Sequence, residues 1–177
     1  MKSCLFITVV AVFFLSLAAN LVLAEPPSVS ATCNISCTVA DIVEWSDTSF
    51  PAINLADLTG QNNQVSGSAS LVLYTNGDVK ITADNSDAAQ LSKHDNHKLV
   101  TEYKLEYDAS GVDETGGGTV AWTNYDSFLG EGAQVKHVSG DGAVEVTLSV
   151  RASVETIRPV DSGEYNATQT LTVCWKS

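Results

Sequence analysis

The fold of this chain is decided by one stretch, Asp161-Ser162-Gly163-Glu164-Tyr165-Asn166-Ala167-Thr168-Gln169-Thr170-Leu171-Thr172-Val173-Cys174-Trp175-Lys176-Ser177. A turn containing glycine opens it, and apolar residues then alternate with polar ones at Leu171, Val173 and Trp175. Alternation with a period of two is typical of a strand with one buried face. We therefore predict a strand from Tyr165 to Trp175, with no second strand after it.

Tyr165 stands at the start of this predicted strand, directly after the turn. A tyrosine in that place looks like the tyrosine corner that opens the penultimate strand of an immunoglobulin-type sandwich. A sandwich of this kind would lack its last strand, and an unpaired sheet edge promotes association. We therefore expect an incomplete immunoglobulin-like sandwich whose gap is filled by its own chain or by another chain.

The N-terminal residues have the pattern of a secretory signal peptide. Lys2 supplies the positive charge, Leu5 to Leu17 the apolar run, and Val22-Leu23-Ala24 the cleavage site. We expect a signal peptide at 1–24 and a mature chain that starts at Glu25, which is long enough for one sandwich domain. The sequence has no other apolar run of bilayer length, so we expect an exported protein without membrane insertion after cleavage.

The chain is strongly acidic, with 21 acidic and nine basic residues, one of which leaves with the signal. This balance opposes nucleic-acid binding, which needs clustered lysine and arginine. The aspartates lack the alternating spacing and closing glutamate of a calcium loop. His94 and His97 form a His-x-x-His without the further ligands that zinc requires. We expect no metal and no cofactor.

The sequence contains no arrangement typical of an active site. No serine lies in a nucleophile elbow, and no cysteine has a plausible base partner. The aromatic group Trp122, Tyr125 and Phe128 could line a carbohydrate-binding patch, although packing in the core and loops is the favoured role. We predict no catalytic residues and no enzyme activity.

The rest of the chain shows short strand patterns and no helical period. Residues 29–39 and 144–154 alternate between apolar and polar side chains, which predicts half-buried strands. Residues 71–74 and 79–82 flank Asn76-Gly77, a pair that predicts a tight hairpin turn with positive backbone angles. Together these patterns predict an all-β sandwich.

Three of these features together resemble the chaperone–usher pilus subunits, in particular the archaic class that includes spore coat protein U-like proteins. The first is Val29-Ser30-Ala31-Thr32 leading to Cys37-Thr38-Val39-Ala40, which is similar to the family's alternating extension and Cys-Thr-Val strand. The second is Ala69 to Asp84 around Thr75-Asn76-Gly77, and the third is Asp161 to Tyr165 with the threonine-rich strand after it. The resemblance covers both ends and the middle, and 85–140 carry little of it.

The resemblance implies an incomplete sandwich that a periplasmic chaperone holds open and an outer-membrane usher assembles. In the fibre, the extension of the next subunit completes each sandwich by strand addition. The extension would be Glu25 to Ser36, ahead of an incomplete domain at 37–177. The resemblance also implies copies of itself or other pilins as partners, an extracellular fibre reached through the periplasm, and a role in adhesion or biofilm. The candidate donor side chains are Val29, Ala31, Cys33 and Ile35.

Two alternatives remain open at this point. Residues 29–39 are also compatible with an ordinary first strand that pairs within its own domain, although Pro26-Pro27 favour an extended arm. The whole chain is also compatible with a complete immunoglobulin-like adhesion or binding domain that is secreted or displayed on a cell surface. Against that alternative, Ala167 stands where such a domain has its second cysteine.

Three cysteines remain after the signal peptide, and export favours a disulfide. Cys33 and Cys37 would lie about 13 Å apart on a strand, beyond the roughly 7 Å that a disulfide spans. Cys37 with Cys174 is therefore the favoured pair and Cys33 with Cys174 the second choice. Cys174 falls on the opposite face of its strand from the apolar residues, which opposes the simplest pairing. The family's usual partner cysteine is absent, because Leu73 and Tyr74 stand there.

Overall fold

The computed structural model describes residues 28–94, 97–109, 117–137 and 142–176. The chain divides into two units, Met1–Thr38 and Val39–Ser177, and each is described by itself. The signal peptide predicted at 1–24 and the start of the predicted extension, 25–27, lie outside the described residues.

The first unit is described over residues 28–38, which contain no strand and expose their side chains. Val29 is 96% exposed and Ile35 is 90% exposed. The predicted half-buried strand over 29–39 is therefore not formed in this structure. The physical reason is that alternation only makes a segment compatible with a sheet. A strand forms where a neighbouring strand supplies backbone hydrogen bonds.

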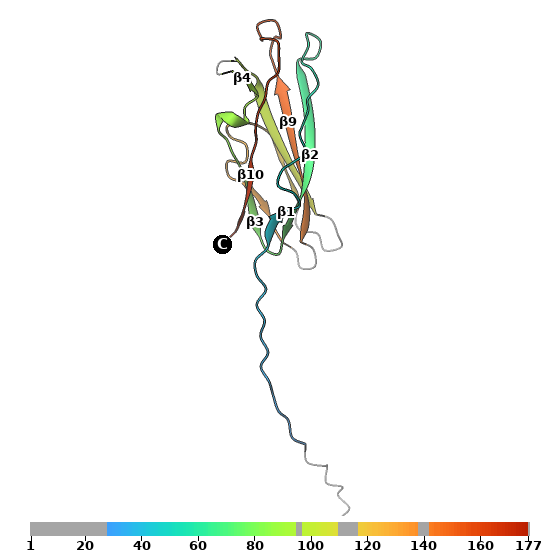
Figure 1. Cartoon of the computed structure of the whole chain (residues 1–177), viewed down its shortest axis with the longest axis vertical. Helices are drawn as coiled ribbons and strands as arrows, with labels where there is room; N and C mark the ends of the chain where they lie inside the picture. The colour runs from blue at the N-terminus through green and yellow to red at the C-terminus, as the bar shows by residue number, and fades with distance from the viewer. Residues whose placement is uncertain (1–27, 95–96, 110–116, 138–141, 177) are drawn as a thin grey trace, which may run out of the picture. The chain divides into compact units, whose positions relative to one another are not determined.

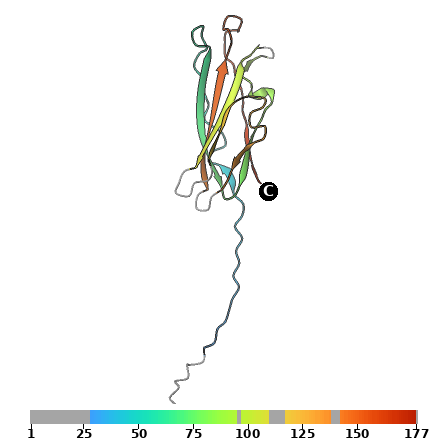
Figure 2. The same cartoon turned by 180° about the vertical axis from the view of Figure 1, so that it is seen from behind.

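The second unit consists of antiparallel sheets (Figure 1 and Figure 2). The five-stranded sheet has the order β1 (Val43–Trp45), β2 (Gln64–Thr75), β9 (Ala143–Ser153), β6 (Val100–Ala109) and β7 (Gly118–Asn124). The three-stranded sheet has the order β10 (Leu171–Trp175), β3 (Val79–Ala83) and β8 (Ala133–Val135). A small hairpin joins β4 (Ser92–Lys93) to β5 (His97–Lys98), and η2 (Asp87–Ala89) is a single 3-10 turn. The described residues contain no α-helix, and the prediction of an all-β sandwich is confirmed.

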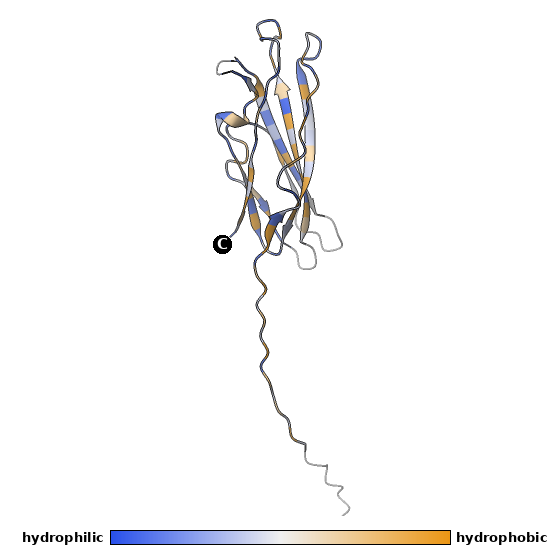
Figure 3. Cartoon of the chain, viewed as in Figure 1, coloured by the Kyte–Doolittle hydropathy of each residue, from blue (hydrophilic) through white to orange (hydrophobic). Residues whose placement is uncertain are grey.

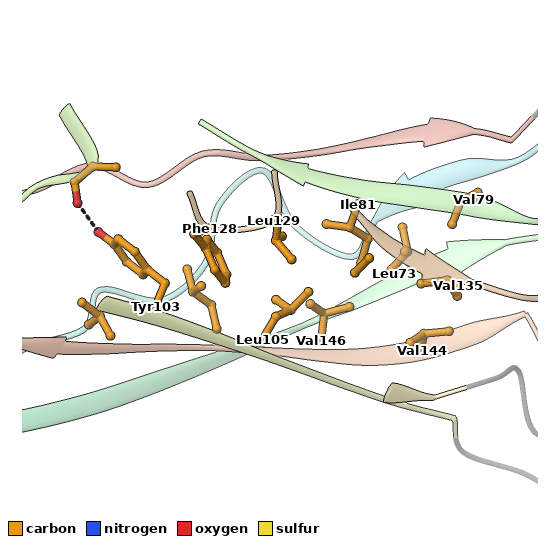
Figure 4. Close-up of a cluster of buried hydrophobic side chains, with 14 residues drawn as sticks. Leu73, Val79, Ile81, Tyr103, Leu105, Phe128, Leu129, Val135, Val144 and Val146 are labelled. Carbon is orange, nitrogen blue, oxygen red and sulfur yellow. Dashed lines mark hydrogen bonds between the residues drawn. The ribbon is translucent and has the colours of Figure 1, made fainter. Parts of the chain in front are cut away.

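The core lies between the two larger sheets, and side chains from both reach into it (Figure 4). Strand β9 shows how the sequence builds it, because Val144, Val146 and Leu148 are buried while the alternating residues face outward. Figure 3 shows this alternation as hydrophobic and hydrophilic bands along the strand. Tyr103 is also buried, and its hydroxyl donates a hydrogen bond to the Ala89 carbonyl at 2.6 Å.

The connection at Asn76-Gly77 differs from the prediction. Strand β2 pairs with β1 and β9, whereas β3 pairs with β10 and β8, so the chain crosses from one sheet to the other here. Gly77 does not have a positive φ. Its lack of a side chain instead makes room for Trp175, since a Cβ at Gly77 would lie 1.8 Å from the indole Cζ3. The predicted tight hairpin is therefore wrong, and the segment is a corner between sheets.

Candidate strand-acceptor edge

Strand β10 lies at the edge of its sheet and pairs on one side only, with β3, in the described part of the chain. In an antiparallel pair, the backbone N–H and C=O of one residue point to the same neighbour, and those of the next residue point the other way. The Lys176 N–H donates to the Asp78 carbonyl at 2.9 Å, so even-numbered residues face β3. The backbone groups of Leu171, Val173 and Trp175 consequently point away from β3.

The same pattern continues upstream of β10. The Thr170 carbonyl accepts from the Asp84 N–H at 2.9 Å, and the Thr168 N–H donates to the Ala88 carbonyl at 2.7 Å. Asn166 forms an isolated bridge to Ser92. Even-numbered residues therefore use their backbone groups on the β3 side along the whole line.

We call the line Tyr165–Trp175 the open edge. Within the described residues, no backbone hydrogen bond joins its odd-numbered members to another segment. These members are Tyr165, Ala167, Gln169, Leu171, Val173 and Trp175. Of the strand predicted from Tyr165 to Trp175, the structure forms Leu171–Trp175 as a strand, and upstream of it only Asn166 forms an isolated bridge, to Ser92.

Strand β1 forms a second unpaired edge, at the end of the five-stranded sheet. The Ile42 carbonyl accepts from the Asn76 N–H at 3.3 Å, and the Ser46 N–H donates to the Val72 carbonyl at 2.8 Å. Even-numbered residues of β1 therefore face β2, and Val43 and Trp45 direct their backbone groups away from it. Strands β1 and β10 are neighbours in space but are not hydrogen-bonded to each other.

Apolar side chains line both edges without being fully covered. Val43, Trp45, Leu171 and Val173 are partly buried and pack against the main core. Trp175, at the end of the open edge, is 38% exposed. A partly covered core beneath two unpaired edges offers an added strand both hydrogen bonds and apolar contacts.

Side chains contact the turn that precedes the open edge, at Asp161 and Ser162. The Tyr165 hydroxyl donates to the Asp161 carbonyl at 2.9 Å, which is the hydrogen bond that a tyrosine corner makes. The Lys93 ammonium donates to the Ser162 carbonyl, and the His97 Nδ1 lies 3.4 Å from an Asp161 carboxylate oxygen. The turn therefore fixes the point at which the open edge begins.

The predicted donor side chains and the three described cysteines are all exposed. Val29, Ala31, Cys33 and Ile35 are all exposed within residues 28–38. Cys33, Cys37 and Cys174 are free and exposed, so the structure gives no support to a Cys37–Cys174 disulfide. Cys174 faces outward on β10, opposite the partly buried Leu171 and Val173, as the alternation predicted.

The three aromatic residues singled out in the sequence do not form a common patch. Phe128 is 0% exposed, with its ring centroid 5.4 Å from that of Tyr103, and Tyr125 packs against the same core. Trp122 instead lies beneath Arg151. The guanidinium carbon Cζ of Arg151 is 4.6 Å from the centroid of the Trp122 ring. The favoured packing role is confirmed for Phe128 and Tyr125.

The described residues contain no group of three histidine, cysteine, aspartate or glutamate side chains that could hold a metal ion. Among the same residues, no helix has the length and apolar character needed to cross a bilayer.

Sequence reasoning missed one residue of the open edge, Gln169. The available signal was a polar side chain at a position that the alternation turns inward.

No protein-family model matches the chain, and no curated protein matches it. Among solved structures, a chain in a structure of a chaperone–usher pilus is similar over 86% of this chain and 99% of that chain. The two are 12% identical and the TM-score is 0.40. A likeness at this level carries no argument about function. The class that the strands themselves define is an all-β sandwich protein with two main open sheets, one with the edges β1 and β7 and the other with the edges β10 and β8.

Proposed function

We propose that this chain is a non-enzymatic structural subunit of an exported surface fibre, in which copies are joined by strand donation. The observation that carries the proposal is the open edge Tyr165–Trp175 together with the unpaired edge of β1. The extension Glu25–Ser36 of a second copy would supply the missing strand. Its inserted side chains would be Val29, Ala31, Cys33 and Ile35.

The hydrogen-bonding pattern of the two edges suits a single added strand. A strand directs the backbone groups of alternate residues to opposite sides. One set from the extension would pair with Val43 and Trp45 of β1, and the other set with the odd-numbered residues of the open edge. Each edge would gain the neighbour that the described structure lacks.

The energy of such an insertion is large relative to the stability of a domain. Val29 and Ile35 are almost fully exposed, and burying a large aliphatic side chain contributes about 1.5–3 kcal/mol. Two such residues contribute on the order of 3–6 kcal/mol, against a whole-domain stability of about 5–15 kcal/mol. The donated strand would therefore set much of the stability of the assembled subunit.

The resemblance of the sequence motifs extends the proposal to partners and location. A periplasmic chaperone would cover the open edge before assembly, and an outer-membrane usher would exchange the chaperone for the next subunit. The fibre would be extracellular and would serve adhesion or biofilm. The tyrosine-corner bond of Tyr165 also fits the second candidate, a complete immunoglobulin-like adhesion domain, but Ala167 stands where such a domain has its second cysteine, which favours the fibre.

The test compares two forms of the protein, residues 25–177 and residues 37–177, each with and without a peptide that spans 25–36. We expect the short form to be weakly stable or aggregated, and the peptide to raise its melting temperature. The matched control is the same peptide with Val29→Asp and Ile35→Asp, which should have no effect. A short form that is already a stable monomer and ignores the peptide would rule out strand donation.

A monomeric long form needs one further measurement, because its extension could fill the edge of its own chain. In that case its melting temperature should not depend on protein concentration. Mixing two differently labelled long forms after unfolding and refolding would then yield no mixed species. Mixed oligomers that grow with concentration would instead show donation between copies.

A further inference from the structure

Gln169, on the open edge, is partly buried, and the atoms of its amide group are enclosed. Among the described residues, neither the Nε2 nor the Oε1 atom of Gln169 has a hydrogen-bond partner, and both atoms are inaccessible to solvent. Leaving a buried amide unpaired costs free energy, because the group has lost its water without gaining a partner. Gln169 shares the inward face of the open edge with Ala167, Leu171 and Val173, all of which are apolar.

We propose that Gln169 sets the specificity of the open edge by hydrogen-bonding to a small polar side chain of the inserted strand. This inference rests on the proposed function. In the extension of the chain itself, the matching residue is Cys33. The other three inserted side chains are aliphatic, whereas a thiol is a weak donor and a weak acceptor.

The match also fixes the register of the inserted strand. The open edge has six inward positions and the extension has four inward side chains, so several alignments preserve the apolar face. These alignments differ by steps of two residues, because a shift by one would turn the apolar side chains outward. Of these alignments, only those that place Cys33 opposite Gln169 give the buried amide a side-chain partner.

This register is possible for both orientations of the inserted strand. If the strand is parallel to β10, this register sets Ile35 beside Leu171. If it is antiparallel, the register sets Val29 beside Val173. In each case a large aliphatic side chain meets an apolar, partly buried position of β10. The predicted ligand class is therefore an extended apolar segment with one small hydroxyl or thiol side chain at the Gln169 position.

The test uses the mature chain 25–177 with Val29→Asp and Ile35→Asp as the acceptor, because its own extension cannot fill the edge. Two peptides spanning 25–36 are compared by fluorescence anisotropy, one with Cys33→Ser and one with Cys33→Val. A second acceptor adds Gln169→Met, which keeps the side-chain volume and removes the amide. Far-ultraviolet circular dichroism checks that both acceptors are folded.

We expect the serine-containing peptide to bind the first acceptor about tenfold more tightly than the valine-containing peptide. On the Gln169→Met acceptor the order should reverse, because an apolar pocket prefers the larger apolar side chain. Tighter binding of the valine-containing peptide to the first acceptor would overturn the role of Gln169, whether or not the second acceptor folds. If neither of these peptides nor the unmodified 25–36 peptide binds the first acceptor, the proposed function is wrong, and the inference about Gln169 is wrong with it.

Discussion

The substitution Gly77→Ala tests how the corner between β2 and β3 is built. A Cβ at this position would lie 1.8 Å from Cζ3 and 2.2 Å from Cη2 of Trp175, so the indole must move away. Covering a large apolar side chain contributes about 1.5–3 kcal/mol, and part of this is lost when the ring is displaced. Alanine also lowers the conformational entropy of the unfolded chain, which stabilises the folded state by about 0.4–1 kcal/mol. We expect a net loss of about 1–2 kcal/mol, which is a fall of roughly 3–6 °C in melting temperature for a domain of this size.

The assay is thermal unfolding of the mature chain, followed by circular dichroism and by tryptophan emission. Trp175→Ala and the double variant complete a mutant cycle. Without the indole, Gly77→Ala should cost much less, because the three atoms nearest to the added Cβ all belong to that ring. A melting temperature of Gly77→Ala within 1 °C of the parent would refute the close approach. An undiminished penalty in the Trp175→Ala background would place the requirement in the backbone instead.

Three further predictions concern side-chain contacts. Tyr165→Phe removes the hydroxyl that bonds Asp161, and urea unfolding should show a loss of about 1 kcal/mol; an unchanged midpoint would mean that the corner does not depend on this bond. Burial raises the pKa of Tyr103 to about 12, so between pH 10 and 12 the unfolded tyrosine loses its proton while the folded one keeps it. The free energy of unfolding should therefore fall as the pH rises through that window, and denaturant titrations at several pH values check it. Glu102→Gln weakens the ion pair with Arg151, in which the Arg151 Nη2 lies 2.6 Å from the Glu102 Oε2. The free energy of unfolding should fall by about 0.5–1 kcal/mol, and by less at high salt.

The strands of the large sheet could be predicted from the sequence because their signal is local. The alternation over 144–154 predicts a strand, and β9 runs from Ala143 to Ser153. The same alternation over 29–39 predicts a strand that the structure does not form. The two segments differ in whether a neighbouring strand is present, and that is a property of the whole fold.

Contacts between distant residues explain the other differences. The pair Asn76-Gly77 is typical of a hairpin turn, but here glycine is required by the approach of Trp175 from β10. The inward position of Gln169 follows from the alternation, whereas its unpaired amide depends on what surrounds it in the folded chain. Sequence reasoning therefore located the candidate edge, and the structure identified which backbone groups and which side chain make it distinctive.

The two main sheets have further edge strands on their far side, β7 and the three-residue β8. Strand β7 is also an edge of the large sheet, but its pairing with β6 shifts register between Tyr103 and Leu105. A bulge of this kind twists an edge and discourages further pairing. The open edge keeps one parity from Asn166 to Lys176, and it is a regular strand over Leu171–Trp175.

Proline substitutions at two adjacent residues separate the open side of this edge from its paired side. The Ala167 N–H points to the open side, whereas the Thr168 N–H donates to the Ala88 carbonyl at 2.7 Å. Proline removes the N–H, so Thr168→Pro should destabilise the domain by about 1–3 kcal/mol even without a donor strand. Ala167→Pro should change the stability of the domain by less than about 1 kcal/mol, yet weaken binding of the 25–36 peptide about three- to tenfold. The reverse ranking in thermal unfolding would show that the assigned parity is wrong, and with it the side of the edge from which a second copy could pair.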